Sequence, residues 1–460
     1  MSLQPASPAD RSLWVPPAIL PPDRDPHPAV LGLRTFQDQI RGWSRSLYFE
    51  DAWRPMPGTP LFVTQPEALQ TLFVDQAQDF DQGAMFKRMF RVVWGRGVLT
   101  ADEASWRWQR RASAHAFRPT TLSALAPRIA AQAETAIDGW LSPRRKRPLD
   151  MRQAVTALTF RIIIDTMLSG DAYFDAGRMQ QRIATFFEDV GRLRISYFLM
   201  PDRYHATRPD ATSRHRAPLL REIRAMVAAR REAPPRGDLV DLLLAARDPE
   251  TGETMDDALI ADNLLGFILA GHETTSVGLT WALYVLAAHP DTAARVRAEV
   301  RAVAGDGPLT GEHVDALVFT RQVMSEVLRL YPPGYLVTRV AHRDCELAGH
   351  RVRAGSRVNV PIYAAHRHRS RWTDPDAFDP DRFAPGAPPP GRHVYLPFGA
   401  GPRICMGAAF AMMESVLILA AVARRTDLAY AGKKPPVPRA GMTLWPADGM
   451  PLRVTPAQPA

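Results

Sequence analysis

The chain has 460 residues, of which 46% are hydrophobic and 23% charged, so it can bury a large core in two or three domains or in one large unit. Its formal net charge is +9, but the basic residues are spread along the chain without zinc-finger spacing or RNA-binding aromatic motifs, so we expect no nucleic-acid partner. The two cysteines, Cys345 and Cys405, are too few for a disulfide framework and indicate a reducing compartment, the cytoplasm.

The N-terminal segment is predicted to be an extended arm. Residues 1–30 contain repeated prolines, which exclude a regular helix. Residues 1–14 lack the basic and apolar regions of a signal peptide. No run of about 18 uncharged apolar residues occurs in the sequence, so we expect a soluble protein without a membrane span.

Three short features are predicted between the arm and residue 100. Thr59–Thr64 has the composition of a short strand, and a helix is expected at Pro66–Val74. Phe80–Thr100 mixes aromatic residues with glycines, which predicts a long loop with short helical turns.

A pair of side chains suited to binding an anion follows at Trp106 and Arg110. The two stand four apart and share one face of a predicted helix, so an indole N–H and a guanidinium can converge on one anion. Packing or a cation–π contact between the two is the alternative.

Helical periodicity continues through three segments, Leu122–Leu141, Arg152–Leu168 and Arg178–Tyr197. Aromatic side chains gather between Phe186 and Met200, just before a proline. These aromatic residues either roof an apolar pocket or pack in the core.

The longest helical pattern runs over Asp257–Ala288 and ends at a His-Pro pair. Its centre, residues 270–275, reads Ala-Gly-His-Glu-Thr-Thr and places the acid of Glu273 beside the hydroxyl of Thr274. Such groups are costly to bury unless they are satisfied or functional, although a solvated polar turn is the alternative. Gly271 weakens the helix locally and threonine hydroxyls can bond to helix carbonyls, so we expect a distortion or a water-filled notch.

The next part of the chain combines an ion pair with short strands. Glu326 and Arg329 stand three apart on a predicted helix and can form an ion pair. Strands are predicted at Leu336–Val340, Cys345–Leu347 and Ser356–Val360. Together with the N-terminal strand they are the only convincing β-rich part of the sequence.

A glycine-punctuated loop, Phe398–Gly407, places Cys405 just before an apolar segment, Ala408–Arg425, that is predicted to be helical. Unpaired N–H groups and the positive dipole end at a helix N-terminus stabilise a thiolate. Arg403 offers a fixed cation for a carboxylate. A thiolate beside such an arginine fits haem, which needs a soft axial ligand and bears acid groups. A buried structural cysteine is the alternative.

The residues Phe398, Gly401, Arg403, Cys405 and Gly407 match the haem-binding signature of the cytochrome P450 family, F-x-x-G-x-R-x-C-x-G, at every fixed position. The chain resembles this family from about residue 55 to 455, with five motifs in the family's order. The resemblance implies a mainly α fold with a small β-rich subdomain, formed by a single domain over residues 31–460. It also implies haem b (iron protoporphyrin IX) between the long helix and the cysteine loop.

The resemblance assigns roles to the residues that would surround the haem. Cys405 would bind the iron, and Ala270 and Gly271 would allow the long helix to approach the haem closely. The other residues expected to contact the haem, in most cases its carboxylates, are Trp106, Arg110, Arg339, Phe398 and Arg403.

Two further groups have expected roles in the family. Glu273 and Thr274 would form an acid–alcohol pair that delivers protons to oxygen as it is reduced. Glu326 and Arg329 would meet Arg382 and hold the segment that positions the cysteine loop. This second role is structural.

The activity implied is that of a haem-dependent monooxygenase that inserts one atom of O2 into a hydrophobic small molecule. Phe267, Ile268 and Leu336 are the apolar candidates for its pocket. A peroxide-driven peroxygenase and a non-catalytic haem-binding sensor are the alternatives, and the Glu273–Thr274 pair argues against both.

The chain has no room for a flavin or iron–sulfur domain beside the haem domain. Electrons are therefore expected from separate proteins, a ferredoxin and a ferredoxin reductase. The candidates for docking an acidic ferredoxin are Lys87, Arg88, Arg107 and Arg111.

Overall fold

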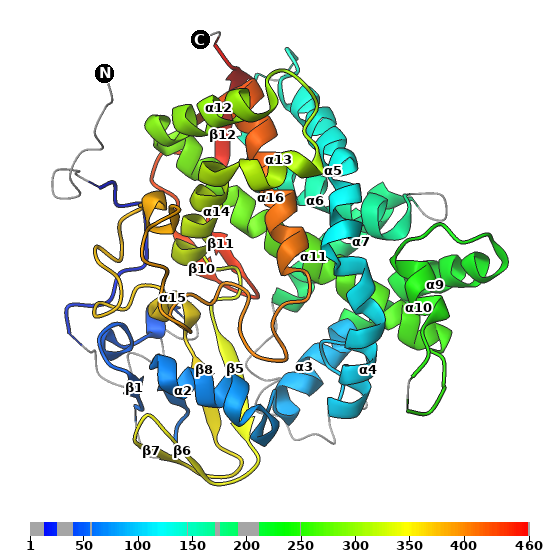
Figure 1. Cartoon of the computed structure of the whole chain (residues 1–460), viewed down its shortest axis with the longest axis vertical. Coiled ribbons are helices and arrows are strands. Elements are labelled where there is room, and N and C mark those ends of the chain that lie inside the picture. The colour runs from blue at the N-terminus through cyan, green and yellow to red at the C-terminus, as the bar shows by residue number, and fades with distance from the viewer. Residues whose placement is uncertain are drawn as a thin grey trace.

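Helices form most of the molecule and the strands form small sheets, so the mainly α fold class is as the sequence predicts. The computed structural model describes residues 13–24, 40–55, 58–144, 146–170, 175–191, 211–248 and 250–458. Figure 1 shows the largest sheet, with β1, β8 and β5, at one end of the molecule and most helices beyond it. Within the described part of the chain, no helix is both long enough and apolar enough to cross a bilayer.

The helices follow one another along most of the chain. They are α2 (Pro66–Gln70), α3 (Ala84–Trp94), α4 (Glu103–Ala114), α5 (Pro119–Trp140), α6 (Met151–Leu168), α7 (Ala176–Gly191), α9 (Ala211–Glu232), α10 (Leu239–Ala245), α11 (Asp257–Ala288), α12 (Pro290–Ala304), α13 (Gly311–Ala316), α14 (Val318–Leu330), α15 (Ile362–Ala365) and α16 (Ala408–Arg425). The bounds of α11 and α16 are those that the sequence predicts. Both ends of α11 are set locally, because the Asp256 carboxylate accepts a hydrogen bond from the Leu259 N–H at 2.6 Å and Pro290 follows the last turn.

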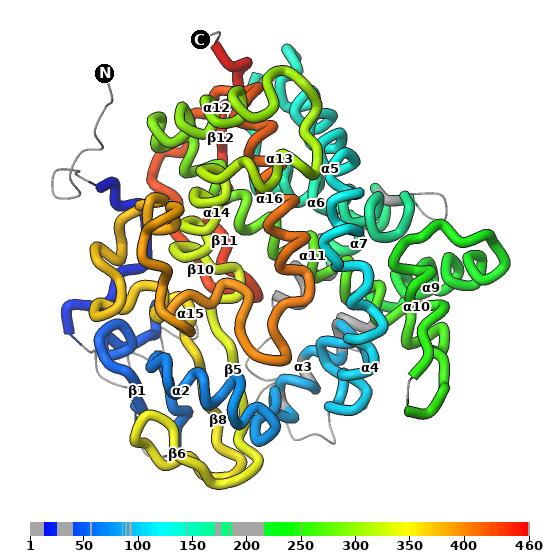
Figure 2. Tube along the Cα trace, in the orientation of Figure 1, coloured from blue at the N-terminus to red at the C-terminus, as the bar shows by residue number. Residues whose placement is uncertain are grey.

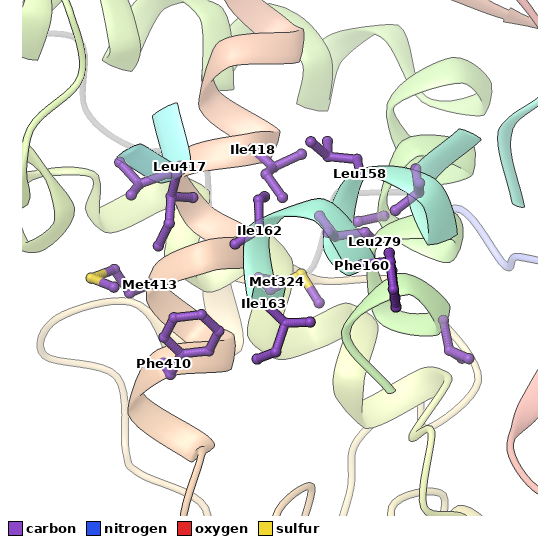
Figure 3. Close-up of a cluster of buried hydrophobic side chains, with 14 of the residues drawn as sticks. Leu158, Phe160, Ile162, Ile163, Leu279, Met324, Phe410, Met413, Leu417 and Ile418 are labelled. Atoms are coloured by element: carbon purple, nitrogen blue, oxygen red, sulfur yellow. The ribbon is translucent and has the colours of Figure 1, made fainter. Parts of the chain in front are cut away.

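The helical core lies where α6, α11, α14 and α16 meet (Figure 3). Helix α11 is buried on nearly all sides, so its side chains are apolar around most of its circumference. Ile163 of α6, Met324 of α14 and Phe410 of α16 point toward one another in this cluster, and all three also line the cavity described below. The core therefore forms the wall of that cavity.

The largest sheet has five strands in the order β1-β2-β8-β5-β3. Its strands are β1 (Ala52–Trp53), β2 (Leu61–Val63), β3 (Phe80–Asp81), β5 (Val337–Ala341) and β8 (Arg357–Val360). Strands β2 and β8 run parallel and the other pairs antiparallel. A second apolar cluster, which includes Leu61, Phe73 and Val358, packs against this sheet. The strand predictions at 59–64, 336–340 and 356–360 are confirmed within a residue or two.

The C-terminal strands were not expected. Besides the hairpin of β6 (Cys345–Leu347) and β7 (His350–Val352), the chain forms β4 (Leu149–Asp150), β9 (Thr426–Tyr430) and β12 (Pro451–Pro456) in one sheet and β10 (Pro438–Ala440) with β11 (Leu444–Pro446) in another. The expectation of only two β-rich regions is therefore wrong. Strands β10 and β11 have three residues each and include a proline, so they lack the alternating pattern that marks longer strands.

The expectation of a loop over Phe80–Thr100 is also wrong, because α3 occupies most of it. Gly83 and Gly95 are the caps of this helix and lie outside it. The rings of Phe86, Phe90 and Trp94 contact one another along one face in tilted arrangements, with centroids 4.1 and 4.9 Å apart. Residues spaced by four place the aromatic side chains on the cavity side of α3.

Residues 13–24, the described part of the proline-rich arm, form no helix or strand. The arm packs on the helical core, with the Trp14 ring within 6.1 Å of Tyr284 and of Phe378. The Tyr331 hydroxyl donates a hydrogen bond to the Pro17 carbonyl at 2.7 Å. The arm is thus bound to both α11 and α14.

A buried ion pair links α14 to the loops that precede the cysteine. Arg329 donates to both carboxylate oxygens of Glu326 at 2.6 and 2.7 Å, and Arg382 lies 3.4 Å from the same carboxylate. The remaining Arg329 N–H groups donate to three backbone carbonyls, those of His366, Pro375 and Ala377. The three charges meet as expected, and the arginine fixes the backbone over residues 366–377.

We predict that Arg329→Met destabilises the protein by about 3–5 kcal/mol, because Glu326 would remain buried without its partner. Urea unfolding measures this loss. Arg321→Met, which breaks an exposed pair with Asp315, should cost at most about 1 kcal/mol. Equal losses for the two variants would contradict the structural role given to Arg329.

Candidate functional site

A cavity of about 1200 Å³ lies between the sheet, α11 and the cysteine loop. Most of its wall is apolar. Its lining joins segments far apart in sequence, among them α3, the centre of α11, β5 and residues 396–407. Figure 2 shows the segment before α16 passing from the side of α15 toward α3 and α4.

Cys405 lies in this wall, two residues before Gly407, which caps α16. Its N–H donates to the Phe398 carbonyl at 2.9 Å, which closes the loop. The sulfur is open to the cavity, although protein surrounds it on the other sides. Burial raises the pKa of the Cys405 thiol, while the Gly407 N–H and the Arg110 guanidinium act in the opposite direction. The helix N-terminus therefore favours the thiolate as expected, whereas burial opposes it and has the larger effect.

The loop passes so close to α2 and the turn after it that one position admits only glycine. Gly401 has φ of 72°, and a Cβ atom there would collide with the carbonyl oxygen of Phe73. Gly399 also has positive φ, of 74°, but faces open space. The two glycines shape a loop that presents Cys405 to the cavity.

Cationic side chains gather at one edge of the cavity. Trp106 lies between two of them, with the guanidinium carbons of Arg403 and Arg110 at 4.5 and 5.8 Å from its ring centroid. Arg110 also donates to the Ile404 carbonyl at 2.9 Å, so α4 contacts the cysteine loop. Both readings of the Trp106–Arg110 pair, stacking and a shared face toward an anion, are compatible with this geometry.

Arg339 of β5 lines the same cavity. Burial lowers its pKa to about 10, and the nearby charge of Arg403 adds to the effect. Arg403 lies 3.3 Å from Glu103, whereas no ion pair of Arg110 or Arg339 occurs within the described residues. Such a group of like charges is favourable only when an anion lies among them.

The centre of α11 forms the opposite wall, through Ala270, Gly271 and Thr274. A Cβ atom at Gly271 would lie 2.8 Å from the Ile163 side chain, so the glycine allows α6 to pack closely on α11. The Thr274 hydroxyl donates to the Ala270 carbonyl at 2.8 Å. Helix α11 is continuous through these residues, so any distortion or water-filled notch at Gly271 does not interrupt the helix.

The Glu273 side chain points away from the cavity, toward the β10–β11 hairpin. Its Oε1 accepts hydrogen bonds from the Trp445 indole N–H at 2.8 Å and the Thr443 hydroxyl at 3.2 Å. Neighbouring residues on a helix point about 100° apart, so Glu273 faces the β10–β11 hairpin while Thr274 faces the cavity. Glu273 is not among the residues that line the cavity.

The apolar lining is only partly as expected. Phe267 and Leu336 line the cavity, whereas Ile268 is buried in the core. The aromatic side chains predicted between Phe186 and Met200 lie outside the residues whose side chains the structure describes. Phe86, Phe90 and Trp94 of α3 also line the cavity and were not predicted to do so, although their spacing of four was a signal.

His366 supports the start of the cysteine loop. Its Nε2 accepts a hydrogen bond from the Leu396 N–H at 2.7 Å, which requires that the proton of the neutral ring sits on Nδ1, facing the Arg329 carbonyl at 3.2 Å. Burial and the nearby Arg329 charge lower the pKa of His366 from 6.5 to about 3. The buried histidine thus joins the ion pair of α14 to the cysteine loop.

These residues fit haem on several independent grounds. A soft sulfur ligand faces the cavity from one side, and the small residues Ala270 and Gly271 lie on the other. Arginines without an ion pair in the described part of the chain stand at one edge, where the carboxylates of haem would supply the missing negative charge.

The family model and the relatives that match this chain indicate the same protein family. The family model described as Cytochrome P450 matches residues 52–452. Cyclooctatin synthase of Streptomyces melanosporofaciens is 34% identical over 368 residues, which cover 78% of each protein. Cyclooctat-9-en-7-ol 5-monooxygenase of the same organism is 30% identical, with 81% of each protein covered.

Solved structures share the fold. The crystal structure of the cytochrome P450 CYP102L1 has a TM-score of 0.79 and 27% identity, and the match covers 90% of this chain and 96% of that one. The haem domain of cytochrome P450DA has the same TM-score with 25% identity, covering 98% and 99%.

We predict that His366 makes the protein sensitive to acid. The unfolded chain binds a proton at this residue below about pH 6.5, whereas the folded protein, with a pKa of about 3, does not. Stability is therefore lost as the pH falls from about 6.5, by about 2 kcal/mol at pH 5 from this residue alone.

Urea unfolding at pH 7 and pH 5 measures the difference. His366→Gln should show a smaller loss of stability between the two pH values than the natural protein. His350→Gln, on the half-exposed β7, is the control and should lose as much as the natural protein. If His366→Gln is as acid-sensitive as the control, the interpretation is wrong.

Proposed function

The chain belongs to the cytochrome P450 family, and we propose how its residues perform haem-dependent hydroxylation. It is a monooxygenase that uses O2 to hydroxylate a small molecule. The observation that supports the assignment of its site most strongly is the convergence of Cys405, the centre of α11 and a group of arginines on one cavity.

We assign Cys405 as the ligand of the iron and haem b as the cofactor. The bound cofactor supplies oxygen activation, and a thiolate ligand favours cleavage of the O–O bond. Arg110, Arg339 and Arg403, with the Trp106 indole, would bind the two carboxylates, because the one carboxylate paired with these arginines among the described residues is Glu103, on Arg403. Phe398, in the loop that presents Cys405, would pack beside the cofactor.

We assign proton handling to Thr274 and Glu273. The Thr274 hydroxyl lies in the cavity wall, where it can exchange its bond to the Ala270 carbonyl for one to water or oxygen. Glu273 is the adjacent carboxylate of α11 and can pass protons from the hairpin side of the helix. This pair supports oxygen-dependent turnover over a peroxygenase or a sensor.

The substrate is proposed to be a largely hydrocarbon molecule. Aromatic and aliphatic side chains dominate the lining, including Phe90, Phe117, Phe267 and Leu336. Such a wall binds apolar surface and offers few hydrogen-bond partners. A relative named for cyclooctat-9-en-7-ol, a cyclic hydrocarbon with one hydroxyl, suggests the same substrate class.

Electrons are proposed to come from a ferredoxin and its reductase. Arg107 and Arg111 lie exposed on α4, the helix whose Arg110 contacts the cysteine loop, so a partner bound there would be close to Cys405. Each has one exposed acidic neighbour, Glu103 at 3.2 Å and Glu250 at 3.8 Å, with which a ferredoxin would compete. Lys87 is paired with both Asp81 and Asp102 and is a weaker candidate. The side chain of Arg88 lies outside the described part of the structure.

We predict that the reduced protein with carbon monoxide shows the absorption band of a haem-thiolate, and that Cys405→Ala abolishes it. Cys345→Ser, which changes the other cysteine on β6, should retain the band. A band that survives in Cys405→Ala would assign the ligand to another residue.

We predict that Arg107→Glu with Arg111→Glu raises the dissociation constant for an acidic ferredoxin by about threefold to tenfold, with a reduced dependence on salt. Titration calorimetry at two salt concentrations measures both the dissociation constant and its dependence on salt. The control is Lys433→Glu, which reverses the charge of an exposed lysine after β9. Equal affinities for the double variant and the natural protein would remove this surface from consideration.

A further inference from the structure

The β10–β11 hairpin contacts both the cavity and the acid of α11. Gly441 and Met442, in its turn, line the cavity. The next residue, Thr443, and Trp445 of β11 donate hydrogen bonds to Glu273 Oε1. Glu273 is 170 and 172 residues away in sequence from these donors, so only the tertiary fold brings them together.

We propose that Trp445 and Thr443 are positioning residues for Glu273. Their donors hold the carboxylate on the hairpin side of α11, and it serves the cavity only when it leaves them or through an intervening water. Two hydrogen bonds to one carboxylate oxygen favour this rotamer over one facing the cavity. The hairpin thus sets how often Glu273 can supply a proton on the Thr274 side.

The indole of Trp445 is itself held in place. The guanidinium carbon of Arg152, in the first turn of α6, lies 4.3 Å from the centroid of its ring. This cation–π contact fixes the ring plane and so the direction of the N–H.

Other groups around Glu273 do not replace these donors. The neighbouring His272 is buried, its Nδ1 faces the Ile268 carbonyl at 2.6 Å, and burial lowers its pKa. The Ser276 hydroxyl donates to the backbone carbonyl of Glu273 and not to its carboxylate. Among the residues that the structure describes, the hydrogen bonds to this carboxylate come from Thr443 and Trp445.

The test is a double-mutant cycle in the haem-loaded enzyme with its redox partners and a substrate that shifts its spectrum. Trp445→Phe removes the N–H donor and keeps the aromatic ring under Arg152. We expect it to change the ratio of peroxide released to oxygen consumed, and the solvent isotope effect on kcat, by at least about threefold. In the Glu273→Gln background the same substitution should have almost no effect, because Trp445 acts only through that carboxylate.

Two further variants keep the test decisive. Thr443→Val should act in the same direction as Trp445→Phe, and Thr443→Ser should restore the natural ratio. Trp281→Phe is the matched control, because Trp281 also donates its indole N–H to this hairpin, to the Leu444 carbonyl at 2.8 Å, but does not contact Glu273. It should alter stability without altering the peroxide ratio.

A measurement without turnover tests the contact itself. In the reduced carbon monoxide form, the indole ¹⁵N–¹H resonance that disappears in Trp445→Phe should shift in Glu273→Gln, because a charged acceptor becomes neutral. The positioning role of Trp445 and Thr443 rests on the proposed function, but different results would refute each of them. A protein without a haem-thiolate band refutes the function, whereas equal effects of Trp445→Phe in both backgrounds, or an unshifted indole resonance, refute only the positioning role.

Discussion

The buried bond between Glu326 and Arg329 is the contact on which the site depends most. Both side chains are fully buried, and an isolated charge of either sign would be very costly there. Because the guanidinium also binds three carbonyls, one residue fixes the backbone between α15 and the cysteine loop. His366 extends this network to Leu396. The position of Cys405 is thus set from α14, some 80 residues earlier in the chain.

The charges at the cavity, unlike those of the Glu326–Arg329 pair, are not balanced within the described part of the protein. Glu326 balances its neighbours within the protein, whereas Arg110, Arg339 and Arg403 lie near one another without enough negative charge among the described residues. Burial and mutual repulsion lower the pKa of Arg110 and of Arg339. An anionic group among these arginines would relieve the repulsion, so binding of the proposed cofactor would stabilise the folded protein.

The sequence predicted what is encoded locally. The bounds of α11 follow from a capping aspartate and a proline, and those of α16 from an apolar run after glycine. Residues 80–100 were misjudged because Gly83 and Gly95 cap α3 and do not interrupt it. The β10–β11 hairpin was missed because its strands are too short for periodicity. The direction of Glu273 could not be predicted, since Trp445 and Thr443 reach it only through the tertiary fold.

The packing of the arm and of the residues after it affects where the protein can be shortened. The family match begins at residue 52, yet Trp14 packs on Tyr284 and Phe378. Ile40, Trp43 and Leu47 are also core residues. A recombinant fragment cut at the family boundary would expose apolar surface on α11 and α14 and would tend to aggregate. The folding unit is therefore longer than the region that the family model matches.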